Sequence, residues 1–218
     1  MPVVEIRGNS DLRRALKLFA PDLEKALVKE LGEALQPVAK QAKSLVPSTS
    51  PLSGWSSFQG RNINAQSSMF RRGKFPLYSP SLIRSGIKVI ARVGKRSRDG
   101  YTSMARIENQ SAVGAIYETA GRKHPHGQKW VGPKAGGSSK GVSRSNNPNA
   151  GQQFISHLPP LTNSLMGRGR LIYRAWAENK GVAMGGAMKA IDKARTEFYA
   201  RAQTTTFEKV VPLGKKAA

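Results

Sequence analysis

Apolar residues recur every three or four positions between Leu23 and Leu45, which is the spacing of one face of an amphipathic helix. Pro21 stands where a helix can begin, because N–H groups of the first turn have no helical partner. Pro37 removes one hydrogen bond within the pattern, so a kink is expected near Gln36. The stripe consists of Leu23, Leu27, Leu31, Leu35, Val38, Ala42 and Leu45. It either covers the chain's own sheet, which we favour, or forms an interface between subunits.

Alternation of apolar and polar residues predicts a small antiparallel sheet. The clearest strand is Ser85–Val93, in which every second residue is apolar. Its expected partner is Tyr101–Asn109, reached through a basic turn at Gly94–Gly100. A further short strand is expected at Val3–Arg7.

Two more helices are predicted downstream of the sheet. Ser111 supplies an N-cap side chain for a short helix of small residues, and Gly121 suits a left-handed C-terminal end. The last helix is expected over about Arg170–Ala202, and its methionines are interpreted as core filling. Its expected core face is Met184, Ala187, Ile191, Ala194, Phe198 and Ala202. A break is allowed at three glycines, namely Gly181, Gly185 and Gly186. Thr204–Val211 is expected to be a final strand or an extended arm.

Two long stretches lack periodicity and are predicted to be extended arms, at about 48–80 and 122–167, before a C-terminal tail at 204–218. The first carries Trp55, Phe58, Phe70, Phe75 and Tyr78. These aromatic rings could stack on nucleic-acid bases. They could instead anchor the arm on a neighbouring subunit, which we favour because aromatic and Arg anchors are common in protein interfaces.

The predicted fold class is therefore α+β. A long kinked N-terminal helix and a long C-terminal helix are expected to pack on a small antiparallel sheet, with long extended arms. Residues 1–218 are predicted to form a single domain.

Charge changes the picture, because the 218 residues carry 36 Lys and Arg against 13 Asp and Glu, a formal net charge of +23. No carboxylate lies between Glu33 and Asp99 or between Glu118 and Glu178. The basic excess therefore belongs to the central strands and loops, which suits a polyanion or acidic neighbouring subunits. A merely solvated basic surface is the alternative. The candidate subunit-interface or DNA-facing residues are Arg71, Arg72, Lys74, Lys95, Arg96, Arg98, Glu118, Arg122 and Arg170.

Glu118 is the one acid of the short helix. It is expected either to pair with an Arg of another element or subunit, or to be a solvated surface acid. If it is an intersubunit partner, Glu118→Ala is expected to harm assembly more than folding.

Residue patterns that carry catalysis are missing from the chain. There is no Walker loop, dinucleotide-binding fingerprint or Gly-x-Ser-x-Gly elbow. The absence of Cys excludes disulfides and thiolate metal sites. His124 and His126 have no carboxylate nearby in sequence with which to complete a metal site. No secretory signal or membrane-spanning apolar run is recognisable. We therefore expect no enzymatic activity, no cofactor, no metal and no membrane partner, and folding in a cytoplasm.

Four short stretches, in their order along the chain, carry a family resemblance. The first helix ends in Ala-Lys-Ser-Leu-Val-Pro at 42–47, followed by Ser53-Gly54, and the sheet opens with Ser-Gly-Ile-Lys-Val at 85–89. Then come Gly-Ala-Ile-Tyr-Glu-Thr-Ala-Gly-Arg at 114–122 and Gly-Arg-Leu-Ile-Tyr-Arg-Ala at 169–175. Over about two thirds of its length the chain resembles the tail-completion and head–tail joining, or neck, proteins of long-tailed double-stranded-DNA bacteriophages.

The resemblance implies a structural virion protein without catalytic activity. Such α+β subunits form a homo-oligomeric ring, commonly a hexamer, between the portal-side connector and the tail tube, and DNA passes through its centre. The implied partners are connector, tail-terminator or tail-tube proteins and double-stranded DNA. The implied location is the virion tail or neck, after assembly in the host cytoplasm. The alternative from another class is a basic nucleic-acid-binding protein of ribosomal or chromatin-like type.

Overall fold

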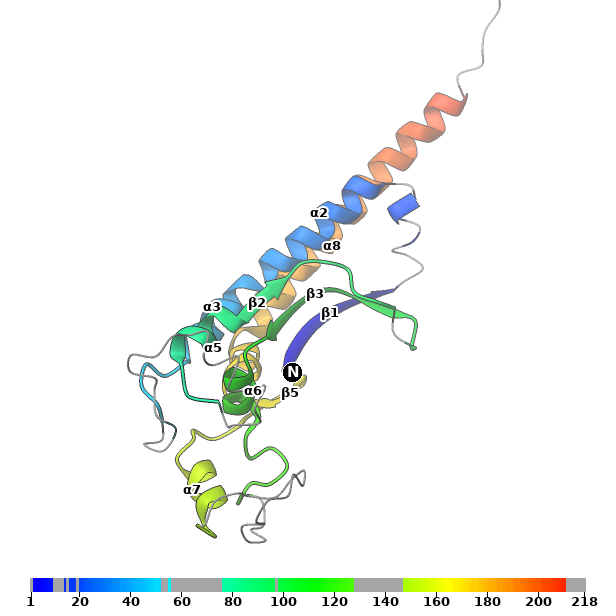
Figure 1. Cartoon of the computed structure of the whole chain (residues 1–218). Helices are drawn as coiled ribbons and strands as arrows, with labels where there is room; N and C mark the ends of the chain where they lie inside the picture. The colour runs from blue at the N-terminus through cyan, green and yellow to red at the C-terminus, as the bar shows by residue number, and fades with distance from the viewer. Residues whose placement is uncertain are drawn as a thin grey trace, which may run out of the picture. The chain divides into compact units, whose positions relative to one another are not determined.

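The computed structural model describes residues 2–9, 14, 16–18, 20–51, 55, 76–96, 98–127 and 147–210. Within these ranges helices and strands are interspersed along the chain (Figure 1). The elements are β1 (Val3–Asn9), α2 (Pro21–Ala34), α3 (Gln36–Ser44), α5 (Pro80–Gly86), β2 (Ile87–Ile90), β3 (Tyr101–Asn109), α6 (Ala112–Thr119), α7 (Ala150–Ser156), β4 (Thr162–Ser164), β5 (Gly167–Gly169) and α8 (Ile172–Val210). The predicted α+β class, with long helices and a small antiparallel sheet, is confirmed.

The main sheet has three strands in the order β1-β3-β2. Backbone hydrogen bonds continue its ladder beyond the strand ends: Gln110 N–H donates to Gly86 O at 2.9 Å, and Gly94 N–H donates to Ser103 O at 2.8 Å. Because the partner numbers run in opposite directions, β2 and β3 are antiparallel, as the alternating pattern predicts. A second, two-stranded sheet pairs β4 with β5.

The predicted kink of the N-terminal helix is confirmed. Helix α2 ends at Ala34, Leu35 is its C-cap, and α3 begins at Gln36. Pro37 lies in the first turn of α3, where a missing N–H leaves no bond unmade. The residues of the predicted stripe from Leu23 to Ala42 are buried within the chain itself. The first of the two interpretations, a stripe that covers the chain's own core, is therefore correct.

The chain divides into two compact units, which are described separately. Unit 1 comprises 1–4, 38–88 and 107–180, and unit 2 comprises 5–37, 89–106 and 181–218. Helix α8 and the strands of the main sheet run through both units. The single domain expected from the sequence stays a prediction.

Unit 2 contains an antiparallel pair of helices, α2 and the later part of α8 (Figure 1). Three contacts define the pairing, and they join Ala34 to Gly186, Glu30 to Lys193 at 2.5 Å and Asp22 to Arg201 at 2.8 Å. The face of α8 that is buried here carries only small side chains, namely Ala183, Ala190 and Ala194. Small residues at a helix contact shorten the distance between the two helix axes, so α2 and α8 can pack closely.

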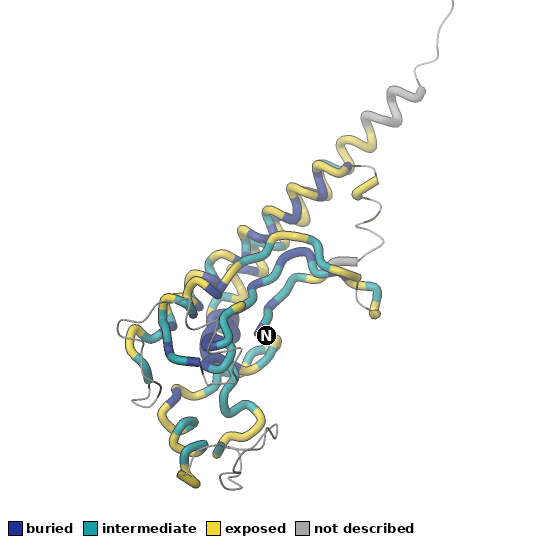
Figure 2. Tube along the Cα trace, viewed as in Figure 1, coloured by how far each residue is buried: buried dark blue, intermediate teal, exposed yellow. Residues whose placement is uncertain are grey.

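Unit 1 has its core where α5 and the end of β3 meet α6 and the first turns of α8 (Figure 2). Two aromatic residues of the first predicted arm belong to this core. Trp55 donates its indole N–H to Pro76 O at 2.8 Å, and its ring lies 5.2 Å from that of Tyr78. Both side chains are buried within the chain, so neither is an anchor on a neighbouring subunit. The other aromatic residues of that arm lie outside the described residues.

Three elements differ from their predictions for local reasons. Ser85 and Gly86 belong to α5, because Ser79 caps Leu82 N–H at 3.4 Å and Pro80 follows at the first helical position. The predicted strand is thus shortened to β2. The second predicted arm contains α7 and the β4–β5 hairpin in its described part. Helix α8 is unbroken at its glycines and continues to Val210, so the prediction of a strand or extended arm from Thr204 is wrong.

The methionines of α8 are not core filling. Met184 and Met188 are 57% and 58% exposed, and Ile191 is 43% exposed. The apolar residues of this helix occupy two faces, of which the alanine face is buried and the methionine face is open to solvent. The core face predicted from the sequence combined residues of the buried alanine face with residues of the exposed methionine face.

Two adjacent glycines of α8 provide a test of this packing. A Cβ at Gly185 would meet nothing within 4 Å, whereas a Cβ at Gly186 would lie 2.9 Å from Ala34 Cβ. Gly185→Ala should therefore raise the free energy of unfolding by about 0.5–1 kcal/mol, the helix preference of Ala over Gly. Gly186→Ala should lose that gain to the overlap with α2. Urea unfolding of both variants measures the difference, and equal effects would contradict the packing of α2 on α8.

Candidate functional site

The carboxylate of Glu118, on α6, caps the N-terminus of α8. Leu171 N–H donates to Glu118 Oε2 at 2.5 Å, Ile172 N–H donates to Oε2 at 3.2 Å, and Tyr173 N–H donates to Oε1 at 3.0 Å. The first N–H groups of a helix have no partner within it, and the positive end of the helix dipole attracts an anion. Leu171 occupies the N-cap position, since its carbonyl accepts from Ala175 N–H at 2.8 Å. Its side chain cannot cap, so Glu118 supplies the missing acceptor.

Arg170 makes the reverse contact, from the start of α8 to the end of α6. Its Nη1 donates to Tyr117 O at 3.0 Å and to Ala120 O at 2.8 Å, and its Nε donates to Pro159 O. The Tyr117 and Ala120 carbonyls lie at the C-terminal end of α6, where the helix leaves its acceptors unpaired. Each helix end is thus completed by a charged side chain from beside the other. We call Glu118, Arg170 and the two helix ends the α6–α8 junction.

Close packing at the junction explains two glycines of the Gly-Arg-Gly-Arg sequence at 167–170. A Cβ at Gly169 would overlap Oε1 of Glu118, so any side chain there would displace the capping carboxylate. Gly167 has a φ of +143° and faces Tyr173, whose ring would lie 2.7 Å from an added Cβ. Strand β5 therefore reaches α8 along a path that only glycine permits at these two positions.

Arg122 and Tyr173 extend the junction toward β1. The Arg122 guanidinium donates to Arg168 O and lies 5.0 Å from the centre of the Tyr173 ring, a cation–π distance. The Tyr173 hydroxyl accepts the Val3 N–H at 3.3 Å. Gly121, with a φ of +81°, turns the chain between α6 and Arg122, as its predicted left-handed position requires.

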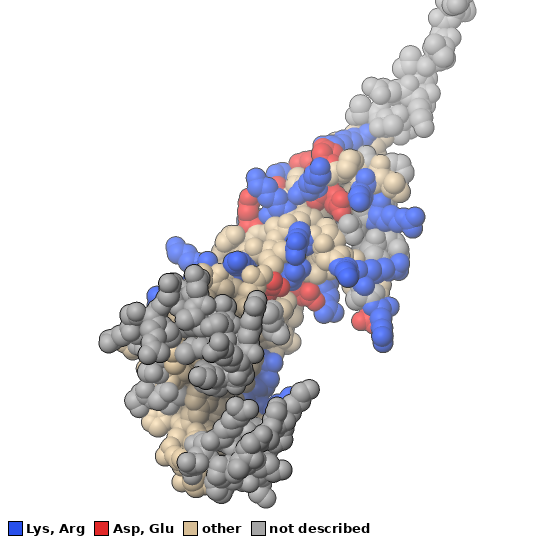
Figure 3. Space-filling model, in the orientation of Figure 1, with Lys and Arg blue, Asp and Glu red and all other residues tan. Residues whose placement is uncertain are grey.

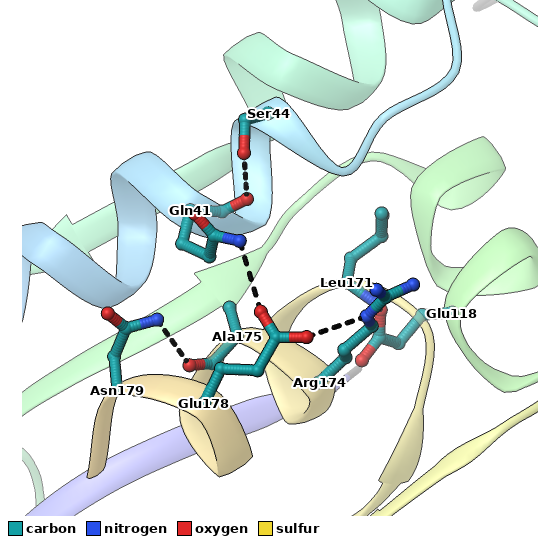
Figure 4. A network of polar contacts seen from close by, with 8 residues as sticks. All are labelled: Gln41, Ser44, Glu118, Leu171, Arg174, Ala175, Glu178 and Asn179. Atoms are coloured by element: carbon teal, nitrogen blue, oxygen red, sulfur yellow. Dashed lines mark hydrogen bonds and ion pairs between the residues drawn. The ribbon is translucent and has the colours of Figure 1, made fainter. Parts of the chain in front are cut away.

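A second polar network lies on the next turn of α8 (Figure 4). The Glu178 carboxylate accepts from Arg174 Nε at 2.8 Å and from Gln41 Nε2 of α3 at 3.0 Å. These hydrogen bonds lower the pKa of Glu178, with the contact from Arg174 as the larger cause. The network ties α3 to the beginning of α8 at the surface of unit 1. The Glu118 carboxylate beside Leu171 is visible in the same view.

Burial dominates the electrostatics of the junction. Glu118 is 0% and Arg170 4% exposed. Burial raises the pKa of Glu118, while the three backbone N–H groups and the charge of Arg122 oppose that rise. Burial lowers the pKa of Arg170, and the nearby Tyr117 and Glu118 oppose that fall. Since both groups are buried and hydrogen-bonded to backbone groups of the chain itself, neither side chain is open to a substrate.

The candidate residues from the sequence fall into three groups. Glu118, Arg122 and Arg170 come together at the junction, inside unit 1. Lys95, Arg96 and Arg98 are exposed on the β2–β3 hairpin of unit 2. Arg71, Arg72 and Lys74 lie outside the described residues. The expectation of a solvated Glu118 is wrong, because this side chain and Arg170 are buried and used within the chain.

Metal binding, ligand binding and membrane insertion each require particular arrangements of residues. Across the described residues, no group of three His, Cys, Asp or Glu side chains is placed to hold a metal ion. A depression of about 610 Å³ lies beside the junction, lined by α6, the turn after it and α7. Its polar lining includes Arg122, Lys123 and His124 and contains no carboxylate. Among the described helices, none has the length and apolar character to span a membrane.

Comparison with known proteins returns no match: no protein-family model, no curated protein and no solved structure is similar to this chain.

The junction predicts a folding defect for Glu118→Ala. The substitution leaves three N–H groups of α8 and the Arg170 charge without their buried partner. The free energy of unfolding should therefore fall by about 3–5 kcal/mol, as is typical when one partner of a buried charged contact is removed. Thr119→Ala is the control on the same helix, since the Thr119 hydroxyl donates to Ala115 O within that helix. Chemical unfolding measures both, and a Glu118→Ala chain as stable as Thr119→Ala would refute the capping role.

The same carboxylate predicts a dependence of stability on pH. The pKa of Glu118 is raised above its ordinary value of 4.5, so the folded chain holds this proton more tightly than the unfolded chain. The part of its contribution that comes from binding this proton is therefore complete below about pH 4.5 and is lost as pH rises through the folded-state pKa. The difference in unfolding free energy between the wild type and Glu118→Gln should decrease over that window. An increase would show that the three N–H donors outweigh burial.

Proposed function

We propose that this chain is a structural virion subunit of a tailed phage. In this proposal it forms a homo-oligomeric ring, commonly sixfold, in the neck at the head–tail interface. Its neighbours are connector, tail-terminator or tail-tube proteins, and double-stranded DNA passes through the ring. The protein has no catalytic activity and requires no cofactor.

The observation that carries the proposal is an apolar stripe on the solvent-facing side of α8. Met184, Met188, Ile191 and Tyr199 are all exposed, and at about 100° per residue they lie on one face of the helix. Contiguous exposed apolar side chains are typical of surfaces that bind another protein. Gly181 and Gly185 border this α8 stripe, with nothing within 4 Å of an added Cβ. They leave room for close approach by a partner.

The resemblance adds support because of where its motifs lie. The stretches 114–122 and 169–175, which are far apart in sequence, supply the two halves of the α6–α8 junction. Their residues are used to hold helices, not to present reactive groups. Residues that stabilise the packing of helices are expected in a subunit with a structural role.

A second apolar site supports assembly from unit 1. The turn between β4 and β5 presents Leu165, 89% exposed, and Met166 at the tip of the hairpin. Exposed apolar side chains that lie side by side are typical of surfaces that bind another protein. The proposed subunit thus has exposed apolar residues in each of its two units.

The alternative is a basic nucleic-acid-binding protein of ribosomal or chromatin-like type. The observation that favours it is the row of exposed cations on the β2–β3 hairpin. It predicts tight binding to random duplex DNA at physiological salt by a chain that stays monomeric. A ring, or co-purification with tail-tube proteins, favours the virion subunit instead.

The α8 stripe can be tested with two matched substitutions. Met188→Glu places a charge in the stripe, whereas Val182→Glu places the same charge on another face of α8 at a similarly exposed position, 63% against 58%. Met188→Glu should weaken self-association at least about tenfold, or about 1.4 kcal/mol. Val182→Glu should leave it unchanged. Both should unfold within about 0.5 kcal/mol of the wild type, because both sites are exposed.

Sedimentation or mass measurement over a range of concentrations gives the association constants. If both variants assemble like the wild type, or if the wild type stays monomeric, the proposed assembly through α8 is wrong.

A further inference from the structure

The β2–β3 hairpin carries the least compensated charge of unit 2. Residues 91–106 contain five cations against the single carboxylate of Asp99. Four of the cations are exposed and lie between β2 and β3, namely Arg92, Lys95, Arg96 and Arg98. On the face that Figure 3 shows, Lys and Arg side chains are spread widely over the described residues, and Asp and Glu side chains lie in a few places between them.

The acids of the same unit are already used on its helices. Asp22 pairs with Arg201 at 2.8 Å, Glu30 with Lys193 at 2.5 Å, and Asp192 with Arg195 at 3.7 Å. Within the described part of the chain, Arg92, Lys95 and Arg98 have no such carboxylate partner. The helix pair is therefore close to neutral through its own contacts, whereas the hairpin carries a net positive charge.

The positive surface continues from the hairpin onto α2. A depression of about 360 Å³ is lined by Lys25 and Lys29 of α2 together with Arg92. Among the described residues its one acid is Glu24, which is 8% exposed. We call Lys25, Arg92, Lys95, Arg96 and Arg98 the hairpin basic surface, and leave out Lys29 because it pairs with Glu33 at 3.9 Å.

Backbone hydrogen bonds to β3 fix the path of the segment that carries Arg92, Lys95 and Arg96. Gly94 N–H donates to Ser103 O at 2.8 Å, and a further bridge pairs Arg96 with Thr102. The segment after β2 is thus pinned along β3, and Gly100, with a φ of +79°, makes the return turn. A pinned extended segment spans about 13 Å from Arg92 to Arg96, at about 3.3 Å per residue.

We infer that the hairpin basic surface is the part of the chain that contacts the phosphate backbone of double-stranded DNA. Protein interfaces have an apolar centre from which Lys is depleted. Among the described residues between 91 and 106, Tyr101 at 49% is the one exposed large apolar side chain, and it is surrounded by cations. Phosphate groups need only cations and N–H or O–H donors, which this surface supplies. An acidic protein therefore fits it less well than a duplex.

The contact is independent of base sequence and permits sliding. A duplex carries one phosphate charge per about 1.7 Å of its axis with both strands counted, so a length of about 13 Å carries about eight charges, of which a part faces the protein. With phosphates at every position along the duplex, no axial register is preferred. The inference deepens the proposed function, on which it rests for the presence of DNA, by naming the element that faces the channel.

Salt-dependent binding tests the inference on the full chain. The probe is a short random-sequence duplex carrying a fluorophore, titrated between about 50 and 200 mM salt. Replacing Lys95, Arg96 and Arg98 together by Ala should reduce the magnitude of the log–log salt slope, per chain, by about 2–3, at about 0.9 for each lost phosphate contact. The matched control replaces Lys40, Lys43 and Lys189, three exposed lysines elsewhere, and loses the same charge. It should change the slope by less than about one.

Two results would overturn the inference. One is an equal effect of both triple variants, which would make the binding a property of net charge alone. The other is poly-L-glutamate that displaces the duplex at equal charge concentration, which would assign the surface to an acidic protein. Sizing of the same samples separates this inference from the proposed function. If the chain binds the duplex through the hairpin but never assembles, the proposed ring is wrong. If the chain forms a ring but the hairpin substitutions leave its affinity for the duplex unchanged, only the inference is wrong.

Discussion

Two buried charged side chains hold unit 1 together, because the one on α6 caps the start of α8 and the one before α8 caps the end of α6. Helix ends leave backbone donors and acceptors unpaired, and in a core no water is available to pair them. Glu118 supplies the acceptor for the start of α8, and Arg170 supplies the donor for the end of α6. The glycines at 167 and 169, the turn at Gly121 and the packing of Tyr173 all follow from the need to bring these two ends together.

Much of the fold could be predicted because its signals are local. The stripe of the first helix, the Pro37 kink, the Ser111 cap and the Gly121 turn each depend on residues within a few positions. The junction could not be predicted, because Glu118 meets α8 more than fifty residues later. Leu171 carries no cap side chain to announce a missing partner. By contrast, Ser79-Pro80 is a local start signal for α5 that the strand pattern obscured. The methionines of α8 were misassigned because 3.6-residue periodicity cannot tell a buried face from an exposed one.

Charge and apolar surface are distributed differently over unit 2. Its helices pair their acids internally, at Asp22, Glu30 and Asp192. What remains unsatisfied is an apolar face on α8 and a basic hairpin beside α2. One is suited to contact with protein and the other to contact with a polyanion, and a neck subunit in the proposed ring needs both. An isolated chain with net charge +23 would repel its own copies, so the apolar contacts have to outweigh that repulsion.

The central claim is that this polypeptide is a building block of a closed ring. Electron microscopy of the purified chain by negative staining tests it most directly, because even low resolution distinguishes a ring from a compact particle. The account predicts closed rings of several copies with an open centre wide enough for a DNA duplex. A uniform population of single compact chains, at concentrations well above those in an assembling cell, would contradict it.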